Sequence, residues 1–90
     1  MESKALLKIN NELGLHARSA AKIVALTGEY KAALFLKKDN HEVDGSSILA
    51  ILTLACPKGT EIEARAVGEE SERLMAALGE LFEQKFGEGK

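Results

Sequence analysis

Residues 60–67 alternate between apolar and charged side chains, and this pattern constrains the fold more tightly than any other segment does. The apolar positions are Ile62, Ala64 and Ala66, and the charged positions between them are Glu61, Glu63 and Arg65. A period of two residues predicts a β-strand with one buried face and one face in water. Such a strand needs neighbouring strands at its edges and a second layer over its apolar face.

The remaining segments supply both the other strands and the second layer. Strand-like patterns predict further strands at residues 5–9, 31–37 and 41–43. Helical spacing of apolar side chains predicts helices at residues 17–27, 48–55 and 70–85. Residues 38–40 are typical of a hairpin turn, because Asp and Asn tolerate positive φ angles.

The order of these elements, β-α-β-β-α-β-α, predicts an α+β fold. We expect a two-layer open-faced sandwich, with four strands in one sheet and three helices on one face. A chain of 90 residues with 46% hydrophobic content has enough material for one core, so residues 1–90 are expected to form a single domain. Residues 86–90, at the C-terminus, are expected to fray.

Composition and charge exclude several classes of protein. Cys56 is the only cysteine, so no internal disulfide is possible and a reducing, cytoplasmic location is predicted. No apolar run approaches the length of about 20 residues needed to cross a membrane, and no signal-peptide pattern follows Met1. We therefore expect a soluble protein that does not insert into membranes.

The net charge of −2 is unevenly distributed along the chain. Residues 1–40 carry seven basic and four acidic side chains, whereas residues 41–90 carry five basic and ten acidic ones. A nucleic-acid-binding protein needs a basic stripe, which this chain lacks, so no nucleic acid is expected as a partner. The basic residues near position 16 suit an acidic partner protein instead.

The segment at residues 13–20 contains the strongest candidate for chemistry. His16, one of two histidines in the chain, follows Gly14 where a polar loop turns into the helix predicted at residues 17–27, and Arg18 lies two positions further on. The first N–H groups of a helix point outward unpaired, and its dipole is positive there, so such a terminus binds anions. An unprotonated imidazole in this position is well placed to take up a phosphoryl group.

Two motifs resemble those of HPr, the histidine-containing phosphocarrier family of the bacterial phosphoenolpyruvate-dependent phosphotransferase system. Gly-Leu-His-Ala-Arg at residues 14–18 resembles its active-site signature, and Ser-Ile-Leu-Ala-Ile-Leu at residues 47–52 is similar to its regulatory-serine segment. The separation of the two motifs and the length of the chain also match the family. The resemblance implies the same fold, with an antiparallel sheet.

The resemblance also implies roles for individual residues. His16 would accept a phosphoryl group at Nδ1 from Enzyme I and pass it to a IIA component, in sugar uptake or its regulation. Arg18 would stabilise the phosphate, and the backbone of Gly14, Ala17 and Arg18 would face it. Such a carrier is a phosphorylated intermediate rather than a stand-alone enzyme. It needs no cofactor or metal in this chain, and we expect a monomer.

Ser47 has two interpretations. A serine before an apolar helical run is a preferred N-cap, worth about 1 kcal/mol. In some members of the family the corresponding serine is instead phosphorylated by a dedicated ATP-dependent kinase, the HPr kinase/phosphorylase. This chain departs from the family at Ser46, where lysine is usual, and at Ala50, where glycine is usual. A third departure is Ser19, where most members have proline.

The helix predicted at residues 48–55 has more apolar side chains than a small core can hold, and exposed apolar clusters often mark partner sites. By resemblance, Ile48, Leu49 and Leu52 take part in binding Enzyme I and IIA. The alternative is that they fill the core, which we expect to hold in part for Ile48 and Ile51.

Other interpretations of the chain stay open. The first is a regulatory HPr paralogue, of the nitrogen branch or switched at Ser47, that does not serve sugar transport. The second is an unrelated small α+β binding module with a chance motif. His41 lies near Asp39 and Asp44, where a metal site is conceivable, but a solvated turn is favoured because no second histidine or cysteine is suitably spaced.

Overall fold

The computed structural model describes all residues, 1–90, and contains the predicted elements in the predicted order. The strands are β1 (Glu2–Lys8), β2 (Ala33–Lys38), β3 (His41–Asp44) and β4 (Glu61–Val67). The helices are α1 (Ala17–Thr27), α2 (Ile48–Leu52) and α3 (Ser71–Glu83), followed by a 3₁₀ turn, η1 (Lys85–Gly87). The predicted α+β open-faced sandwich is confirmed.

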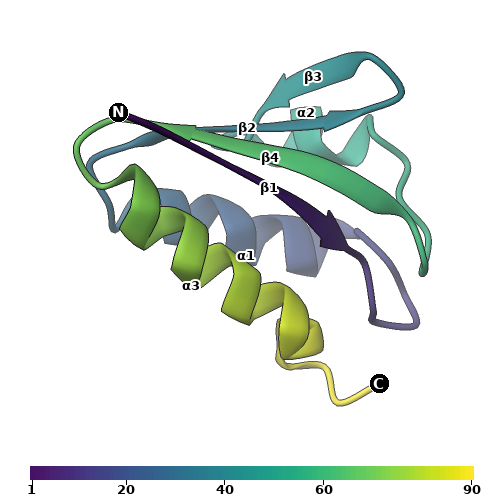
Figure 1. The fold of residues 1–90 in the computed structure, drawn as a ribbon. Helices are drawn as coiled ribbons and strands as arrows, with labels where there is room; N and C mark the ends of the chain where they lie inside the picture. The colour runs from purple at the N-terminus through teal and green to yellow at the C-terminus, as the bar shows by residue number, and fades with distance from the viewer.

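The four strands form one sheet in the order β1-β4-β2-β3, and every neighbouring pair is antiparallel. In Figure 1, α1 and α3 run side by side beneath the sheet, and α2 lies towards the β3 edge. Strand β4 lies between β1 and β2, with helices over one face and solvent over the other, which explains its strict alternation. Its apolar side chains Ile62, Ala64 and Ala66 are at most 1% exposed, because they lie between the sheet and the helices.

The core is mostly aliphatic, as expected of a chain with few aromatic residues. Helix α1 contributes Ala20 and Ile23 to it, and α3 contributes Leu74, Leu78 and Phe82. Burial of each large apolar side chain contributes about 1.5–3 kcal/mol. The apolar faces of α1 and α3 therefore hold these helices against the sheet. This packing fixes the position of the first turn of α1 at one end of the molecule.

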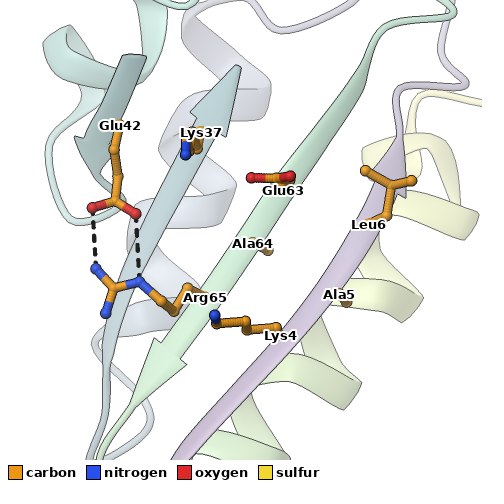
Figure 2. Close-up of a pocket in the computed structure, with 8 residues that line it drawn as sticks. All are labelled: Lys4, Ala5, Leu6, Lys37, Glu42, Glu63, Ala64 and Arg65. Atoms are coloured by element: carbon orange, nitrogen blue, oxygen red, sulfur yellow. Dashed lines mark hydrogen bonds and ion pairs between the residues drawn. The ribbon is translucent and has the colours of Figure 1, made fainter. Parts of the chain in front are cut away.

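The opposite face of the sheet is open to solvent (Figure 2). Arg65 of β4 reaches across β2 to Glu42 of β3 with hydrogen bonds of 3.0 and 3.4 Å, and its guanidinium lies 4.4 Å from the centre of the Phe35 ring. Exposed pairs of this kind are worth about 0.2–1 kcal/mol. The hollow drawn in Figure 2 lies on this face and includes no residue of the 13–20 segment.

The two largest differences from the predicted element boundaries are at the end of α2 and at the start of β1. Helix α2 ends at Leu52 rather than at residue 55, because Ala55 has a φ of +52° and Lys38 Nζ donates to the carbonyls of Leu54 and Ala55. Strand β1 begins at Glu2 rather than at residue 5, because it pairs with β4 as far as Val67. Both differences come from partners distant in the sequence.

Residues 86–90, which were expected to fray, lie against the body of the protein in the structure. Phe86 is fully buried, and its ring centre lies 4.9 Å from that of Phe82. Gly87 and Gly89 have φ angles of +75° and +76°, a conformation that glycine adopts without steric cost, and they let the chain turn back towards the β1–α1 loop. There the carbonyl of Lys90 accepts from the N–H of Glu12 at 3.2 Å.

Candidate active site

His16 is the N-cap residue of α1. Its backbone is extended, with φ −127° and ψ −178°, and its carbonyl accepts the first helical hydrogen bond from the N–H of Ala20 at 2.9 Å. The N–H groups of Ala17 and Arg18 donate no hydrogen bond within the protein. The imidazole therefore lies beside unpaired donors at the positive end of a helix dipole, an arrangement that favours an anion.

Ser19 fixes the backbone of His16 from within the first turn of α1. It is fully buried, and its Oγ accepts from the N–H of His16 at 2.9 Å. The hydroxyl in turn lies 3.1 Å from the carbonyl of His16 and 3.3 Å from that of Gly14. Sequence reasoning noted Ser19 only as a departure from proline, because hydrogen bonds of a hydroxyl cannot be read from a motif.

Gly14 allows the active-site loop to pass close to the segment that follows α2. Its φ is +69°, and a Cβ built on it would lie 2.3 Å from the carbonyl oxygen of Cys56. The next residue, Leu15, donates its N–H to the same carbonyl at 2.8 Å. The N–H of Gly14, predicted to face the phosphate, donates instead to the carbonyl of Asn11 at 3.2 Å, so it is used inside the loop.

The imidazole of His16 contacts the C-terminal segment. Its Nε2 lies 2.7 Å from Oε2 of Glu88, whose side chain is only 9% exposed. The other carboxylate oxygen accepts from Nδ2 of Asn11 at 2.8 Å. Burial acts to raise the pKa of Glu88, but the hydrogen bonds from Asn11 and His16 and the charge of Arg18 outweigh it, so the pKa is lowered.

The contact between His16 and Glu88 was missed by sequence reasoning. The one available signal was Phe86, an apolar side chain four residues after Phe82 that continues the buried face of α3. A buried anchor at that position implies that the residues following it lie on the surface of the fold rather than in free solution.

The side chain of Arg18 is exposed and makes no hydrogen bond or ion pair. With Leu13, Glu88 and Lys90 it lines a hollow of about 430 Å³ at the end of the molecule where α1 begins. Its guanidinium is therefore free to reach an anion bound there.

Ser47 is the N-cap of α2, as predicted. Its Oγ accepts from the N–H of Ala50 at 3.2 Å. The neighbouring Ser46 is exposed, and its N–H and hydroxyl donate to Oδ1 of Asp44 at 2.8 and 2.7 Å. These two hydrogen bonds lower the pKa of Asp44.

Helix α2 packs against α1 and leaves apolar surface uncovered beside it. Leu49 is 79% exposed and Ile48 37%, Leu52 is half-buried, and Ile51 is fully buried. The expectation that part of this helix fills the core therefore holds for Ile51 and only partly for Ile48. Ile48, Leu49 and Leu52 are called the α2 patch below.

The two remaining reactive side chains lie outside this arrangement. His41 is exposed, and its Nε2 lies 3.1 Å from Oγ1 of Thr53. Cys56 is 3% exposed, and burial raises the pKa of its thiol. No three His, Cys, Asp or Glu side chains come together as metal ligands, and no helix is long and apolar enough to cross a bilayer.

Comparisons with known sequences all identify one family. A family profile described as PTS HPr component phosphorylation site matches residues 4–84. The phosphocarrier protein HPr of Xylella fastidiosa (strain Temecula1 / ATCC 700964) is 40% identical over 82 residues, which cover 91% of this chain and 92% of the relative. The phosphocarrier protein NPr of Escherichia coli (strain K12) is 37% identical over 89 residues, 98% of this chain and 99% of the relative.

Solved structures agree with the sequences. HPr-C-His from Thermoanaerobacter tengcongensis has a TM-score of 0.91 at 35% identity, covering 96% of this chain and 97% of the other. A structure described as an HPr dimer from the same organism has a TM-score of 0.77 at 36% identity, covering 91% and 94%.

Proposed function

The chain belongs to the HPr family of phosphocarrier proteins, and on that premise we propose that His16 accepts a phosphoryl group at Nδ1 and passes it on. The observation that carries this proposal is the position of His16 at the open N-terminus of α1, beside the unpaired N–H groups of Ala17 and Arg18. The His16 side chain is 26% exposed, which gives a partner access to it.

Phosphoryl transfer requires little from the protein beyond correct positioning of the reacting groups and stabilisation of the negative charge. In the acceptance step the lone pair of Nδ1 attacks phosphorus, and the bond between phosphorus and the donor breaks. The amides of Ala17 and Arg18 and the guanidinium of Arg18 then stabilise the new negative charge. Gly14 contributes by close approach to Cys56, which sets the path of the loop.

The partners we propose are Enzyme I as donor and IIA proteins or domains as acceptors, met in the cytoplasm by a monomer. The α2 patch supports docking there, because α2 packs against α1 and Leu49 is largely exposed. Arg18 and Lys22 lie on the adjoining helix and are exposed, which suits acidic partner surfaces.

Phosphorylation of the purified protein by Enzyme I and ³²P-labelled phosphoenolpyruvate tests this proposal. We expect label that is labile in acid and stable in alkali on the wild type and on His41→Ala, and none on His16→Ala. His41→Ala is a matched control because it removes the only other imidazole. Equal labelling of His16→Ala would contradict the proposal.

Arg18→Gln tests the role of the guanidinium in the same assay. Loss of one charge-assisted hydrogen bond to the phosphate, worth about 1.5–3 kcal/mol, corresponds to labelling slowed about 10-fold or more. Arg73→Gln, at an exposed arginine of α3 that pairs with Glu70 away from the site, is the control and should label at close to the wild-type rate.

A second candidate function is regulation through phosphorylation at Ser47. It is supported by the position of Ser47 at the start of α2, next to the α2 patch, where two added negative charges would weaken the docking of an acidic partner. We expect an HPr kinase/phosphorylase with ATP to label the wild type and Ser46→Ala, but not Ser47→Ala. Labelling that is lost only in Ser46→Ala would assign the modification to Ser46.

The family contains both HPr and NPr proteins, and the relatives of this chain include both. The sugar branch predicts transfer from phosphorylated His16 to a sugar-specific IIA. Transfer only to a nitrogen-branch IIA would instead favour a regulatory role without sugar transport.

A further inference from the structure

The last six residues, 85–90, form a strap that is fixed to the body of the protein at both ends. At one end Phe86 is fully buried and its carbonyl accepts from Nζ of Lys22 on α1. At the other end the carbonyl of Lys90 accepts from the N–H of Glu12 in the β1–α1 loop. Glu88 lies between these two points, so the fold places its side chain against the active-site loop.

Both carboxylate oxygens of Glu88 have partners. Oε2 lies 2.7 Å from Nε2 of His16, and Oε1 accepts from Nδ2 of Asn11 at 2.8 Å. Asn11 is itself fully buried, and its Nδ2 also donates to the carbonyl of Gly14 at 2.8 Å. A carboxylate held by a buried amide has a fixed orientation, so its second oxygen is directed at the imidazole.

The charge of Glu88 determines the direction of its hydrogen bond to His16. The pKa of Glu88 lies below its ordinary value of 4.5, so the carboxyl is ionised at neutral pH. An ionised carboxylate only accepts hydrogen bonds. In the neutral ring the proton must therefore be on Nε2, and the lone pair on Nδ1.

We propose that Glu88 is a positioning residue for phosphoryl transfer, which keeps the proton of His16 on Nε2 and so presents Nδ1 as the attacking nitrogen. This inference rests on the function proposed above. It assigns a role in the reaction to the C-terminal strap, which is distant in sequence from both motifs.

The transfer step balances with no proton leaving the ring. The lone pair of Nδ1 forms the new N–P bond as the donor's bond to phosphorus breaks, and the donor atom keeps that electron pair. Nε2 retains its proton, so the phosphorylated ring carries a positive charge, which the carboxylate of Glu88 offsets. In the onward step the N–P electron pair returns to Nδ1, and the ring leaves as neutral imidazole rather than as a high-energy imidazolate.

The test uses three variants of the full chain. Glu88→Gln keeps the shape and an acceptor oxygen but removes the charge, and its amide can also donate to a ring nitrogen. Glu88→Ala removes the contact. Glu12→Gln is the matched control, because Glu12 lines the same hollow and carries the same charge, but its side chain makes no hydrogen bond.

The first readout is the ¹⁵N NMR spectrum of the unphosphorylated His16 ring at a pH where it is neutral. We expect the proton on Nε2 alone in the wild type and in Glu12→Gln, and a mixture of both tautomers in Glu88→Gln and Glu88→Ala. The second readout is the rate of phosphoryl acceptance and donation. A charge-assisted hydrogen bond lost from the ring should slow both about 10-fold or more.

An unchanged tautomer in both Glu88 variants overturns the inference, whatever the rates. Wild-type rates in both variants overturn it as well. Because the tautomer is measured without phosphate, it separates failure of this inference from failure of the proposed function. If Glu88→Ala unfolds, Glu88→Gln still decides the question, since it keeps the length and packing of the side chain.

Discussion

Gly14 is the residue at which backbone conformation matters most for the site. Its positive φ and the 2.3 Å approach of a built Cβ to the carbonyl of Cys56 both require glycine. Since that carbonyl also accepts from the N–H of Leu15, the contact fixes the loop immediately before His16. The glycine of the motif is thus a structural requirement for placing the histidine.

Gly14→Ala should therefore lower the free energy of unfolding by about 2–4 kcal/mol, since strain at a positive φ costs about 1–3 kcal/mol and the clash adds to it. The matched control is Gly59→Ala, where φ is +92° but nothing lies within 4 Å of a Cβ. Gly59→Ala should therefore lower the free energy of unfolding only by the cost of backbone strain at a positive φ. Urea denaturation of both variants measures this, and equal losses would show that the approach to Cys56 is unimportant.

At the residue scale, the sequence was sufficient to place His16 and Arg18 at the start of a helix, because the signals for that junction are local. It could not reveal Ser19 as the acceptor for the N–H of His16, since serine was compared only with proline. The sequence could not reveal the role of Glu88 for a different reason. It is separated from His16 by 72 positions, and only the fold brings them together.

At the scale of elements, α2 shows how a short helix divides its apolar side chains between core and surface. Ile51 is buried, whereas Leu49 is 79% exposed, although both belong to one run of apolar residues. The sequence predicted this excess but not the end of the helix. That end depends on Lys38, which lies in β2 and donates to the carbonyls after the helix.

Leu49→Glu should weaken binding of Enzyme I about 10-fold or more, because a central apolar contact becomes a charge that must be desolvated. Its melting temperature should change little, since Leu49 makes no core contact. Leu6→Glu is the matched control, because Leu6 is 62% exposed on the open face of the sheet. Calorimetric titration and thermal melts of both variants provide the comparison, and a fall of many degrees for Leu49→Glu would show that Leu49 belongs to the core.

At the scale of the whole molecule, the sheet and its helices were predictable and the closing strap was not. Alternation in β4 and helical spacing in α1 and α3 are properties of continuous segments, and they predicted a sandwich with helices on one face. The strap depends on a single anchor, Phe86, and on two glycines that turn the chain back. Such a segment has no periodicity, so sequence reasoning treated it as a terminus.

The strap should make stability depend on pH. The folded pKa of Glu88 is lowered from its ordinary value of 4.5, so the folded state favours the ionised form. The ionised carboxylate of Glu88 therefore adds to the free energy of unfolding. This stabilisation is fully present above pH 4.5 and is lost as the pH falls through the folded pKa. We expect the wild type to exceed Glu88→Gln in stability at pH 7, and this difference to shrink on acidification to pH values well below 4.5.

Denaturant titrations of the wild type and Glu88→Gln at several pH values measure this difference. Glu12→Gln again serves as the control, and it should stay close to the wild type at pH 7. A difference between the wild type and Glu88→Gln that grows as the pH falls below 4.5 would have the wrong sign for a carboxylate stabilised in its ionised form.

The identity of the phosphorylated atom tests the central claim most directly. The ¹⁵N-labelled protein would be phosphorylated by Enzyme I and phosphoenolpyruvate, and coupling between ³¹P and the ring nitrogens would be measured by NMR. We predict coupling to Nδ1 of His16 alone, with Nε2 still protonated. Phosphate on Nε2 of His16, on His41 or on a serine hydroxyl would contradict the assignment of His16 Nδ1 as the acceptor.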